Sequence, residues 1–528
     1  MRGGEDVGIE GGAGDGALIA QIGRRMTIGL KQRFISLTGE RPSSLIAMLA
    51  LFALAVLYYW NGLGAGDEIE YARAARRWLA EGPNLGQTHW ALRQFLVLPM
   101  AASFSLFGFN EFAATAPNIA FALVLVGITY VFARRYIAEK EAIAISAVIA
   151  TSCYFVARPI EVDIYGVEAL FAVTAVWLFI ASRDAARPLR WLFAAGVAGG
   201  LAFTIRETSA SIAISLAALT LVFHRQRFFS AGFALGAGYC GVIAFEVLTY
   251  SLASGDPLYR YRIDFGHKSV GAASTHGEGP IGLMRFLLPF KDIAMAPSLT
   301  PFVGLAVIFA GALRWRGAFE PRAASALAAF AVAGLVALVV SAWGLKLAMP
   351  NYYPIFAYAI LVAIGLAIAE AWRRYGALAA GAAFAVILAL NFLAEDFRDY
   401  DDWAEARILA AHAPQFGEPV LTDYATGVRA RLLLEMDGAS EADASSMINL
   451  VTEPKPGALY FRAWGSGLAP AAQGEMLAEF TPLRASPTRE AMRRAGFGDN
   501  PQSRLGRIIS ERPTAAFMRI APHAEEAQ

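Results

Sequence analysis

The chain has 528 residues, of which 56% are hydrophobic and 17% are charged. This composition excludes an ordinary soluble protein and indicates a polytopic membrane protein. The formal net charge of +1 comes from scattered Lys and Arg residues. It excludes a nucleic-acid partner, because binding to a phosphate backbone needs a concentrated basic surface.

Residues 1–42 form a leader that is first Gly-rich and then basic. The apolar run that follows has no convincing small-residue cleavage site, so we expect a retained membrane anchor rather than a signal peptide. A spanning helix needs about 20 predominantly apolar residues, and somewhat fewer when it packs among neighbours. Eleven runs meet this requirement: Ser43–Leu63, Phe112–Ala133, Ala142–Ala157, Ile164–Ser182, Trp191–Ile205, Thr208–Phe223, Phe228–Leu252, Pro297–Leu313, Ala323–Trp343, Tyr352–Ala371 and Ala377–Leu393.

The connections between these runs alternate in charge and length. Every second connection is short and basic, namely "RRYIAEK", "RDAARPLR", "HRQR", "RWRGAFEPR" and "WRRY". The positive-inside rule places them, together with the leader, in the cytoplasm. The opposite connections include two longer loops, residues 64–111 and 253–296, which we expect on the outer side. Because the number of spans is odd, residues 395–528 are expected on that outer side too.

The tail at residues 395–528 has a mixed pattern. Its apolar runs "EPVLTDY" and "GALYFRA" predict strands, and "VRARLLLEM" and "AAQGEMLAEF" predict helices. The sequence therefore predicts an all-α polytopic membrane domain of about eleven transmembrane helices at residues 43–394. A small C-terminal α/β domain outside the cytoplasm follows it.

Three carboxylates, Asp67, Glu68 and Glu70, stand where the chain leaves its first span. The helical period of Tyr71–Glu81 allows a structural interpretation, a capping box in which Asp67 accepts from early backbone amides while Glu70 reaches back. The functional interpretation is a binding or catalytic site, and it gains weight from other charges at outer helix ends.

Five such charged residues occur at three further outer ends of spans. Glu161 and Asp163 lie beyond the third span, Arg206 and Glu207 interrupt an apolar stretch, and Lys346 precedes "LAMPNYYP". Ionisable groups near a membrane are costly and usually face a cavity or a partner. With the amphipathic "ALRQFLVLPMAASFSLFGF" between the first two spans, they predict a charged cavity roofed by an interfacial helix. The alternatives are interfacial or snorkelling positions for Lys346 and Arg206, with Glu207 only neutralising Arg206.

Five segments in this order resemble the GT-C glycosyltransferases that use polyprenyl-phosphate sugars, in the branch of the protein O-mannosyltransferases and the lipid A aminoarabinose transferases. They are "GDEIEYARAARRWLAEG", "LFGFNEFAATAPNIAFAL", "EVDIYGVEALF", "GLAFTIRETSA" and "LAMPNYYPIFAYAIL". The resemblance covers about residues 43–393 and implies the GT-C fold.

The chain also departs from the family pattern. Relatives commonly carry Lys-Pro-Pro after the first-loop helix, where this chain has "THWALRQF", leaving Arg93 or His89 as substitutes. Arg206 replaces the Lys of the usual Lys-Gly-Pro, and Asn351 stands where a cation often precedes the Tyr. These differences leave the donor sugar and its phosphate contacts open.

The resemblance implies transfer of a sugar, with inversion, from a polyprenyl-phosphate donor on the outer face of a bacterial inner membrane. The implied acceptors are lipid A or lipopolysaccharide core, a polysaccharide and a protein hydroxyl. An isoprenoid tail gains about 0.8 kcal/mol for each CH2 that it keeps in lipid, so the chemistry must occur at the membrane interface.

Roles for individual residues follow from the same resemblance. Asp67 is expected to be the general base or the carboxylate that orients the acceptor, with Glu68 and Asp163 holding the acceptor or a divalent cation such as Mg or Mn. Cations must stabilise the charge that develops on the leaving phosphate. The candidates are Arg206, Arg93 and Lys346, with Arg260 and Arg262 in reserve. Further candidates for the substrate pocket are Glu161, Glu207, His89, Tyr352 and Tyr353, although the two tyrosines also suit interfacial anchors.

Two other classes of function compete with this interpretation. A secondary transporter also places charges within a membrane, but usually at mid-depth and between inverted repeats, and this sequence has no evident repeat. A glycan ligase of the cell envelope shares the superfamily pattern. Activity with a labelled polyprenyl-phosphate sugar distinguishes the three classes.

Overall fold

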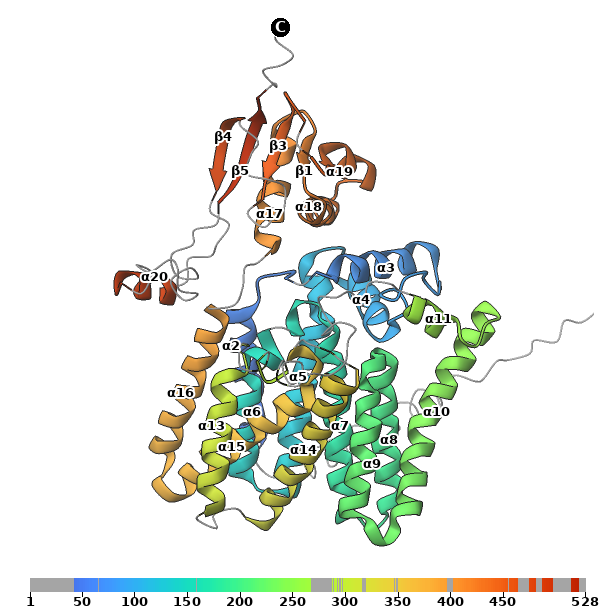
Figure 1. Cartoon of the computed structure of the whole chain (residues 1–528), viewed down its shortest axis with the longest axis vertical. Helices are drawn as coiled ribbons and strands as arrows, with labels where there is room; N and C mark the ends of the chain where they lie inside the picture. Colours follow the sequence, from blue (N-terminus) through green and yellow to red (C-terminus); the bar gives the residue numbers. More distant parts are fainter. Residues whose placement is uncertain are drawn as a thin grey trace, which may run out of the picture.

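The computed structural model describes residues 42–521 except for residues 65, 158, 267–286, 288, 292, 294–295, 297, 316–319, 346, 348–349, 397–401, 454, 464–473, 481–486 and 497–513. Residues 1–41 of the predicted leader and the predicted phosphate ligand Lys346 therefore lie outside the described residues. The chain folds into a helical bundle with a small mixed domain at one end (Figure 1).

Each of the eleven predicted spans coincides with a helix. These helices are α2 (Pro42–Tyr59), α5 (Glu111–Tyr136), α6 (Glu139–Ala150), α7 (Ile164–Arg183), α8 (Pro188–Ile205), α9 (Ala210–Phe223), α10 (Phe228–Ser254), α13 (Thr300–Trp315), α14 (Pro321–Val339), α15 (Pro354–Tyr375) and α16 (Ala377–Asp396). Among the described residues, seven helices are long and apolar enough to cross a membrane: α5, α7, α8, α10, α14, α15 and α16. The chain is therefore a multi-pass membrane protein, and the count of eleven spans stays a prediction.

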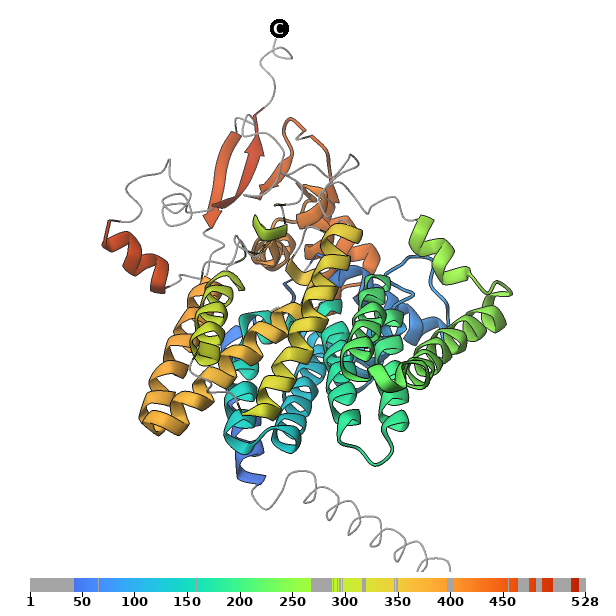
Figure 2. The same cartoon turned by 60° about the horizontal axis from the view of Figure 1, so that its bottom comes forward.

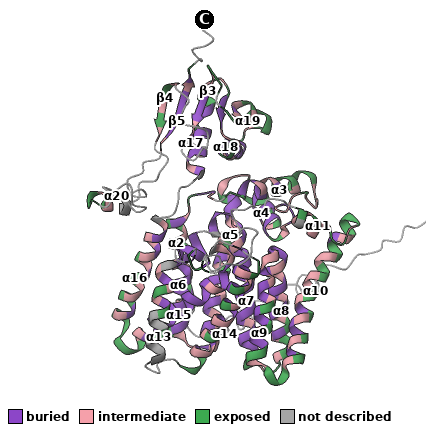
Figure 3. Ribbon diagram, viewed as in Figure 1, coloured by how far each residue is buried: buried purple, intermediate pink, exposed green. Residues whose placement is uncertain are grey.

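The burial of these helices follows their place in the bundle. Helices α7 and α15 bury 78% of their most apolar stretch, whereas α10 and α16 bury 22%. The latter two expose large apolar side chains such as Phe229 and Leu378 to the surroundings. In Figure 3, the ribbons of α10 and α16 at the edges of the bundle are mostly coloured as intermediate or exposed. In the interior, Trp177 donates its ring N–H to the Tyr358 hydroxyl at 2.9 Å, and the Thr129 hydroxyl lies 2.8 Å from the same oxygen. These three buried polar groups are thus paired with one another, as a dry interior requires.

Three helices lie across one end of the bundle, which we call the covered end: α3 (Glu68–Glu81), α4 (Gln94–Phe107) and α11 (Tyr259–Gly266) (Figure 1). Helix α4 falls in the segment predicted to be the interfacial helix. Two hydrogen bonds join the first long loop to the end of α10 and to the second long loop: Tyr250 of α10 donates to the carbonyl oxygen of Leu92 at 2.9 Å, and Tyr259 of α11 donates to that of Gly86 at 2.7 Å. The described parts of both longer connections therefore lie at the same end, as the alternation of the connections predicts.

The C-terminal domain also lies at the covered end in both views (Figures 1 and 2). Its sheet has the strand order β2-β1-β3-β5-β4. Strand β1 is parallel to β2 and β3, while β5 is antiparallel to β3 and β4. The strands are β1 (Val420–Thr422), β2 (Ile448–Leu450), β3 (Leu459–Arg462), β4 (Gly474–Phe480) and β5 (Ala515–Ile520), and the helices are α17 (Asp402–His412), α18 (Tyr424–Met436), α19 (Glu441–Met447) and α20 (Pro487–Arg494).

The predicted fold class, a polytopic helical domain followed by a small α/β domain, is confirmed. One predicted element of the tail is wrong, because "AAQGEMLAEF" contains strand β4 instead of a helix. Its partner β5 is a buried apolar strand that pairs with β4 along its whole length, with a register irregularity between Met476 and Ala478. This pairing with a strand that follows much later in the chain outweighs the local helix preference of Glu, Met, Leu and Ala.

Candidate functional site

The acidic motif begins at the N-terminus of α3. Asp67 immediately precedes this helix with φ −85° and ψ −6°, and its side chain makes no capping hydrogen bond. The capping-box interpretation is therefore wrong for Asp67, whose side chain is exposed at the covered end. Glu68, the next residue, is wholly buried at 0% exposure. The motif thus presents Asp67 outward, holds Glu68 inside and leaves Glu70 partly exposed.

The second acidic segment, Glu161–Val162–Asp163, packs against the start of the first loop. A Cβ atom at Gly64 would lie 2.7 Å from the carboxyl carbon of Glu161, so any larger residue there would force the Glu161 carboxylate to shift. Asp163 caps α7 by accepting from the backbone N–H of Tyr165 at 3.0 Å. Between the two acids, the buried Val162 has φ +60°, a conformation that is strained for a β-branched residue. Such strain persists only where the surroundings enforce it, and it is common at functional sites.

Arg206, which follows α8, lies between two aromatic rings. Its guanidinium carbon is 4.4 Å from the ring centroid of Tyr165 and 3.8 Å from that of Tyr352. It also forms a 3.6 Å ion pair with Glu168 of α7, which in turn accepts from the Ser209 hydroxyl. Both charged side chains are almost fully buried. The two rings lie at 83° to each other, and both attract the guanidinium through cation–π interactions, which occupy its faces rather than its N–H donors.

Arg93, immediately before α4, donates to the hydroxyl of Tyr71 in α3. Burial raises the pKa of Tyr71 to about 12; Arg93 opposes this rise, and the charges of Asp67 and Asp163 add to it. Tyr71 therefore remains a neutral phenol at physiological pH. Arg93 is also within electrostatic reach of Arg206. We call these five residues, Asp67, Tyr71, Arg93, Asp163 and Arg206, the Arg/Asp cluster.

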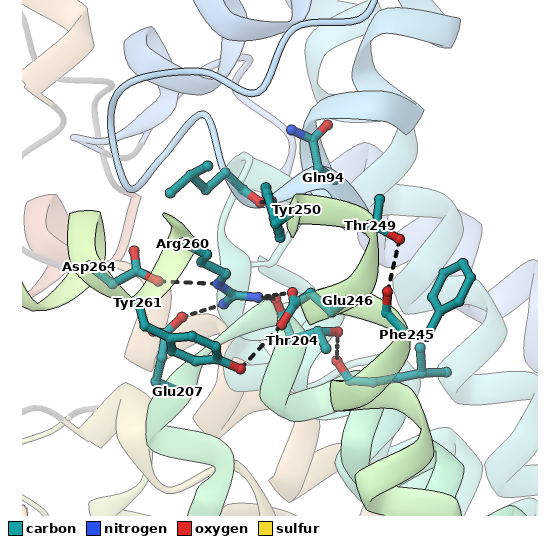
Figure 4. A network of polar contacts seen from close by, with 12 residues as sticks. Gln94, Thr204, Glu207, Phe245, Glu246, Thr249, Tyr250, Arg260, Tyr261 and Asp264 are labelled. Atoms are coloured by element: carbon teal, nitrogen blue, oxygen red, sulfur yellow. Dashed lines mark hydrogen bonds and ion pairs between the residues drawn. The ribbon is translucent and has the colours of Figure 1, made fainter. Parts of the chain in front are cut away.

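A separate network surrounds Arg260, one of the reserve phosphate ligands (Figure 4). Arg260 is 1% exposed and forms ion pairs with Glu207, with Glu246 and, at 3.1 Å, with Asp264. It also donates to the carbonyl oxygen of Thr204. Burial, followed by the neighbouring charge of Glu207, raises the pKa of Asp264 to about 7. The guanidinium thus joins α11 to the ends of α8 and α10, and Glu207 belongs to this network.

The remaining predicted site residues lie apart from these contacts. Arg262 is 71% exposed at its side chain and pairs with Asp256. Tyr353 is buried and donates its hydroxyl to the carbonyl oxygen of Leu347 at 2.6 Å. His89 stacks on Trp90, with ring centroids 3.8 Å apart. Within the described part of the chain, no group of three or more His, Cys, Asp or Glu side chains is arranged to hold a metal ion. A divalent cation at Asp67, Glu68 and Asp163 stays a prediction.

Sequence reasoning missed three residues in the contacts of the Arg/Asp cluster, Tyr71, Tyr165 and Glu168, and two carboxylates of the Arg260 network, Glu246 and Asp264. Glu168 offered a signal, since it is a carboxylate within an apolar run long enough to span the membrane, and such a group usually pairs with a cation. The two tyrosines gave no comparable signal, because tyrosine is common at membrane interfaces.

Comparisons with known proteins agree with this architecture. A family model described as dolichyl-phosphate-mannose-protein mannosyltransferase matches residues 97–250, a range that contains three of the five resembling segments. No curated protein matches the chain. ArnT from Cupriavidus metallidurans, solved bound to undecaprenyl phosphate, is 14% identical with a TM-score of 0.53, and the match covers 91% of this chain and 98% of that chain. In the apo state it gives the same TM-score of 0.53 at 14% identity, covering 84% of this chain and 96% of that chain.

The archaeal oligosaccharyltransferase AglB from Archaeoglobus fulgidus, solved with an inhibitory peptide and a dolichol-phosphate, is 14% identical with a TM-score of 0.45. That match covers 75% of this chain and 64% of AglB, so the chain spans less than two thirds of AglB. The resemblance drawn from the five segments is confirmed by the family match and by the fold shared with ArnT. The chain has a GT-C type fold.

Proposed function

We propose that the chain is an integral membrane glycosyltransferase that moves a sugar from a polyprenyl-phosphate-linked donor to a hydroxyl group of an envelope acceptor. The observation that carries this proposal is the Arg/Asp cluster, which combines two arginines and two carboxylates at one end of a membrane bundle. The fold shared with ArnT bound to undecaprenyl phosphate supports it. The acceptor classes are lipid A or lipopolysaccharide core, polysaccharide, and protein.

The cations of the cluster suit a lipid phosphate. Arg93 and Arg206 belong to connections at the covered end, where a phosphate headgroup resides while its tail remains in the lipid. An arginine fork binds phosphate oxygens through two parallel hydrogen bonds, which are strong because both partners are charged. These side chains would stabilise the negative charge that collects on the phosphate as the sugar leaves.

Asp67 is the proposed general base. It would accept the proton of the acceptor hydroxyl while that oxygen forms a bond to the anomeric carbon. The bond from the anomeric carbon to the phosphate oxygen breaks, and its electron pair leaves with the polyprenyl phosphate. A single displacement of this kind inverts the anomeric configuration. The side chain of Asp67 is exposed and makes no capping hydrogen bond, which leaves it available to act as the base.

The proposal places the covered end on the outer face of a bacterial inner membrane, with the N-terminus in the cytoplasm. A cysteine introduced at the exposed Glu81, with both native cysteines replaced, tests this orientation. We expect a membrane-impermeant maleimide to label it in intact cells. Labelling that occurs only after the cells are broken would overturn the proposed orientation and with it the outward-facing reaction.

The activity is tested in membrane fractions with a panel of radiolabelled polyprenyl-phosphate sugars. The Asp67→Asn variant should lose about 100-fold or more in transfer rate, because a general base contributes 10² to 10⁴. Glu70→Gln, which removes a carboxylate from the same turn of α3, is the matched control and should retain its activity. Unchanged transfer in Asp67→Asn would eliminate the base assignment. Absence of transfer by the parent with every donor would favour a transporter.

A further inference from the structure

The backbone that leads from α2 to Asp67 is held at Leu63 by two hydrogen bonds to side chains. The backbone N–H of Leu63 donates to a carboxylate oxygen of Glu111 at 3.1 Å. The carbonyl oxygen of the same residue accepts from Arg407 at 2.8 Å. Arg407 and Glu111 also bond to each other at 2.8 Å. Both polar groups of one residue, four positions before Asp67, are therefore held by a single ion pair.

The two residues of this ion pair come from distant parts of the chain. Glu111 is the first residue of α5 in the membrane domain, whereas Arg407 belongs to α17 of the C-terminal domain. We call the three residues Leu63, Glu111 and Arg407 the loop clamp. Through it, the C-terminal domain touches the backbone of the acidic loop itself, in addition to resting on the helices of the covered end.

The glycines on either side of Leu63 match this arrangement. Gly62 has φ +85°, and a Cβ atom there would lie 2.7 Å from the Glu111 carboxylate and 2.8 Å from the Arg407 guanidinium. Gly64 makes the corresponding close approach to Glu161 on the other side. Leu63 is itself fully buried. The loop start is thus fixed between the clamp and the second acidic segment.

A second ion pair joins the C-terminal domain to the covered end without touching this backbone. Arg76 of α3 pairs with the largely buried Glu435 of α18. It provides a comparison for the clamp, because its loss weakens the docking of the same domain and leaves both hydrogen bonds of Leu63 in place.

We propose that Arg407 is a positioning residue for sugar transfer: the C-terminal domain fixes the start of the acidic loop through the clamp and thereby aims Asp67. This inference rests on the proposed function. Without the guanidinium, the Leu63 carbonyl loses its donor and the loop gains freedom, and a misplacement of about 1 Å can cost about 100-fold in rate. Arg93, immediately before α4, and Arg206, after α8, are the proposed phosphate ligands; both lie outside the clamped segment at residues 62–67 and keep their positions.

The test uses the full chain in membranes and compares Arg407→Ala with Arg76→Ala. We expect kcat to fall at least tenfold in Arg407→Ala, with the KM for the donor within twofold of the parent, and Arg76→Ala to keep kcat within threefold. Arg407→Lys should recover part of the loss, since an ammonium donates to the carbonyl but lacks the planar fork. Equal losses of kcat in Arg407→Ala and Arg76→Ala would overturn the proposal, because domain docking alone would then explain both.

A second measurement does not depend on the reaction. Hydrogen exchange of the peptides covering residues 61–70 should be faster in Arg407→Ala than in the parent and unchanged in Arg76→Ala. Unchanged exchange in Arg407→Ala would overturn the clamp even if transfer is observed. Faster exchange in a protein whose parent transfers no sugar would support the clamp and refute only the proposed function.

Discussion

Removing the charge of Glu168 provides the sharpest test of the Arg/Asp cluster. The substitution Glu168→Gln keeps the shape of the side chain and an oxygen that accepts from Ser209, but it leaves Arg206 without its closest anion. At a separation of 3.6 Å and an effective dielectric constant of about 20, the lost attraction is about 5 kcal/mol. Glutamine avoids the desolvation that the carboxylate suffers, which offsets part of this loss. We expect the variant to be less stable by about 3 kcal/mol.

The loss of stability in Glu168→Gln should be smaller when a polyprenyl phosphate is bound. The free protein should unfold roughly 5 °C lower than the parent. A bound polyprenyl phosphate supplies the missing negative charge beside Arg206, so the variant should bind it about tenfold more tightly, which corresponds to about 1.4 kcal/mol. The assay is a titration of the detergent-solubilised protein with undecaprenyl phosphate, followed by the unfolding midpoint, which rises with ligand affinity and concentration.

The matched control is Glu141→Gln. Glu141 is also buried and pairs with Arg373, but it lies at the end of the bundle opposite the covered end. That variant should unfold at a lower temperature and bind undecaprenyl phosphate as the parent does. An affinity of Glu168→Gln equal to or below that of the parent would refute Arg206 as a phosphate ligand.

Three further outcomes are expected from the same geometry. Gly64→Ala should lower kcat about tenfold without loss of folded protein, because the added Cβ atom displaces the Glu161 carboxylate. An unchanged rate would show that the contact between Gly64 and Glu161 is not needed for transfer. Val162→Gly relieves the positive φ, worth about 1 kcal/mol, but it removes a buried core side chain worth about 2 kcal/mol. The unfolding midpoint should therefore fall slightly, and transfer should slow in the same assay. The carboxyl of Asp264 has a pKa near 7 in the fold against its ordinary value of 3.8. The folded state therefore binds more protons between these values, and stability should fall as the pH rises from about 4 to about 7. In Asp264→Asn, the unfolding midpoint should depend less on pH between about 4 and about 7 than it does in the parent.

The helices of the bundle could be predicted because each one satisfies its own backbone within lipid, which requires a continuous apolar run. Each such run is visible in the sequence without knowledge of its neighbours. The acids at helix ends could be found for a related reason, since a charge beside a long apolar segment is costly and stands out. Asp67 and Asp163 were recognised in this way, and both act on Tyr71 in the fold.

The partners of the arginines could not be predicted, because they depend on packing between distant segments. Arg206 meets Tyr165 from α7 and Tyr352 from the connection before α15, and nothing in either local pattern specifies that meeting. Strand β4 was missed for the same reason. Its residues favour a helix locally, and only the pairing with β5 makes them a strand.

The partners of each arginine also separate structural cations from those suited to a ligand. Arg260 has three carboxylates around it, so an incoming phosphate would meet an excess of negative charge and would have to displace strong ion pairs. Arg93 donates to a neutral phenol, and Arg206 is held mainly by the faces of two rings and by a carboxylate at 3.6 Å. A phosphate beside these two would add attraction without first breaking a short ion pair. Desolvating a charged pair costs several kcal/mol per ion unless its partners are well placed, so this difference favours Arg93 and Arg206 over Arg260 as the ligands of an anionic lipid headgroup.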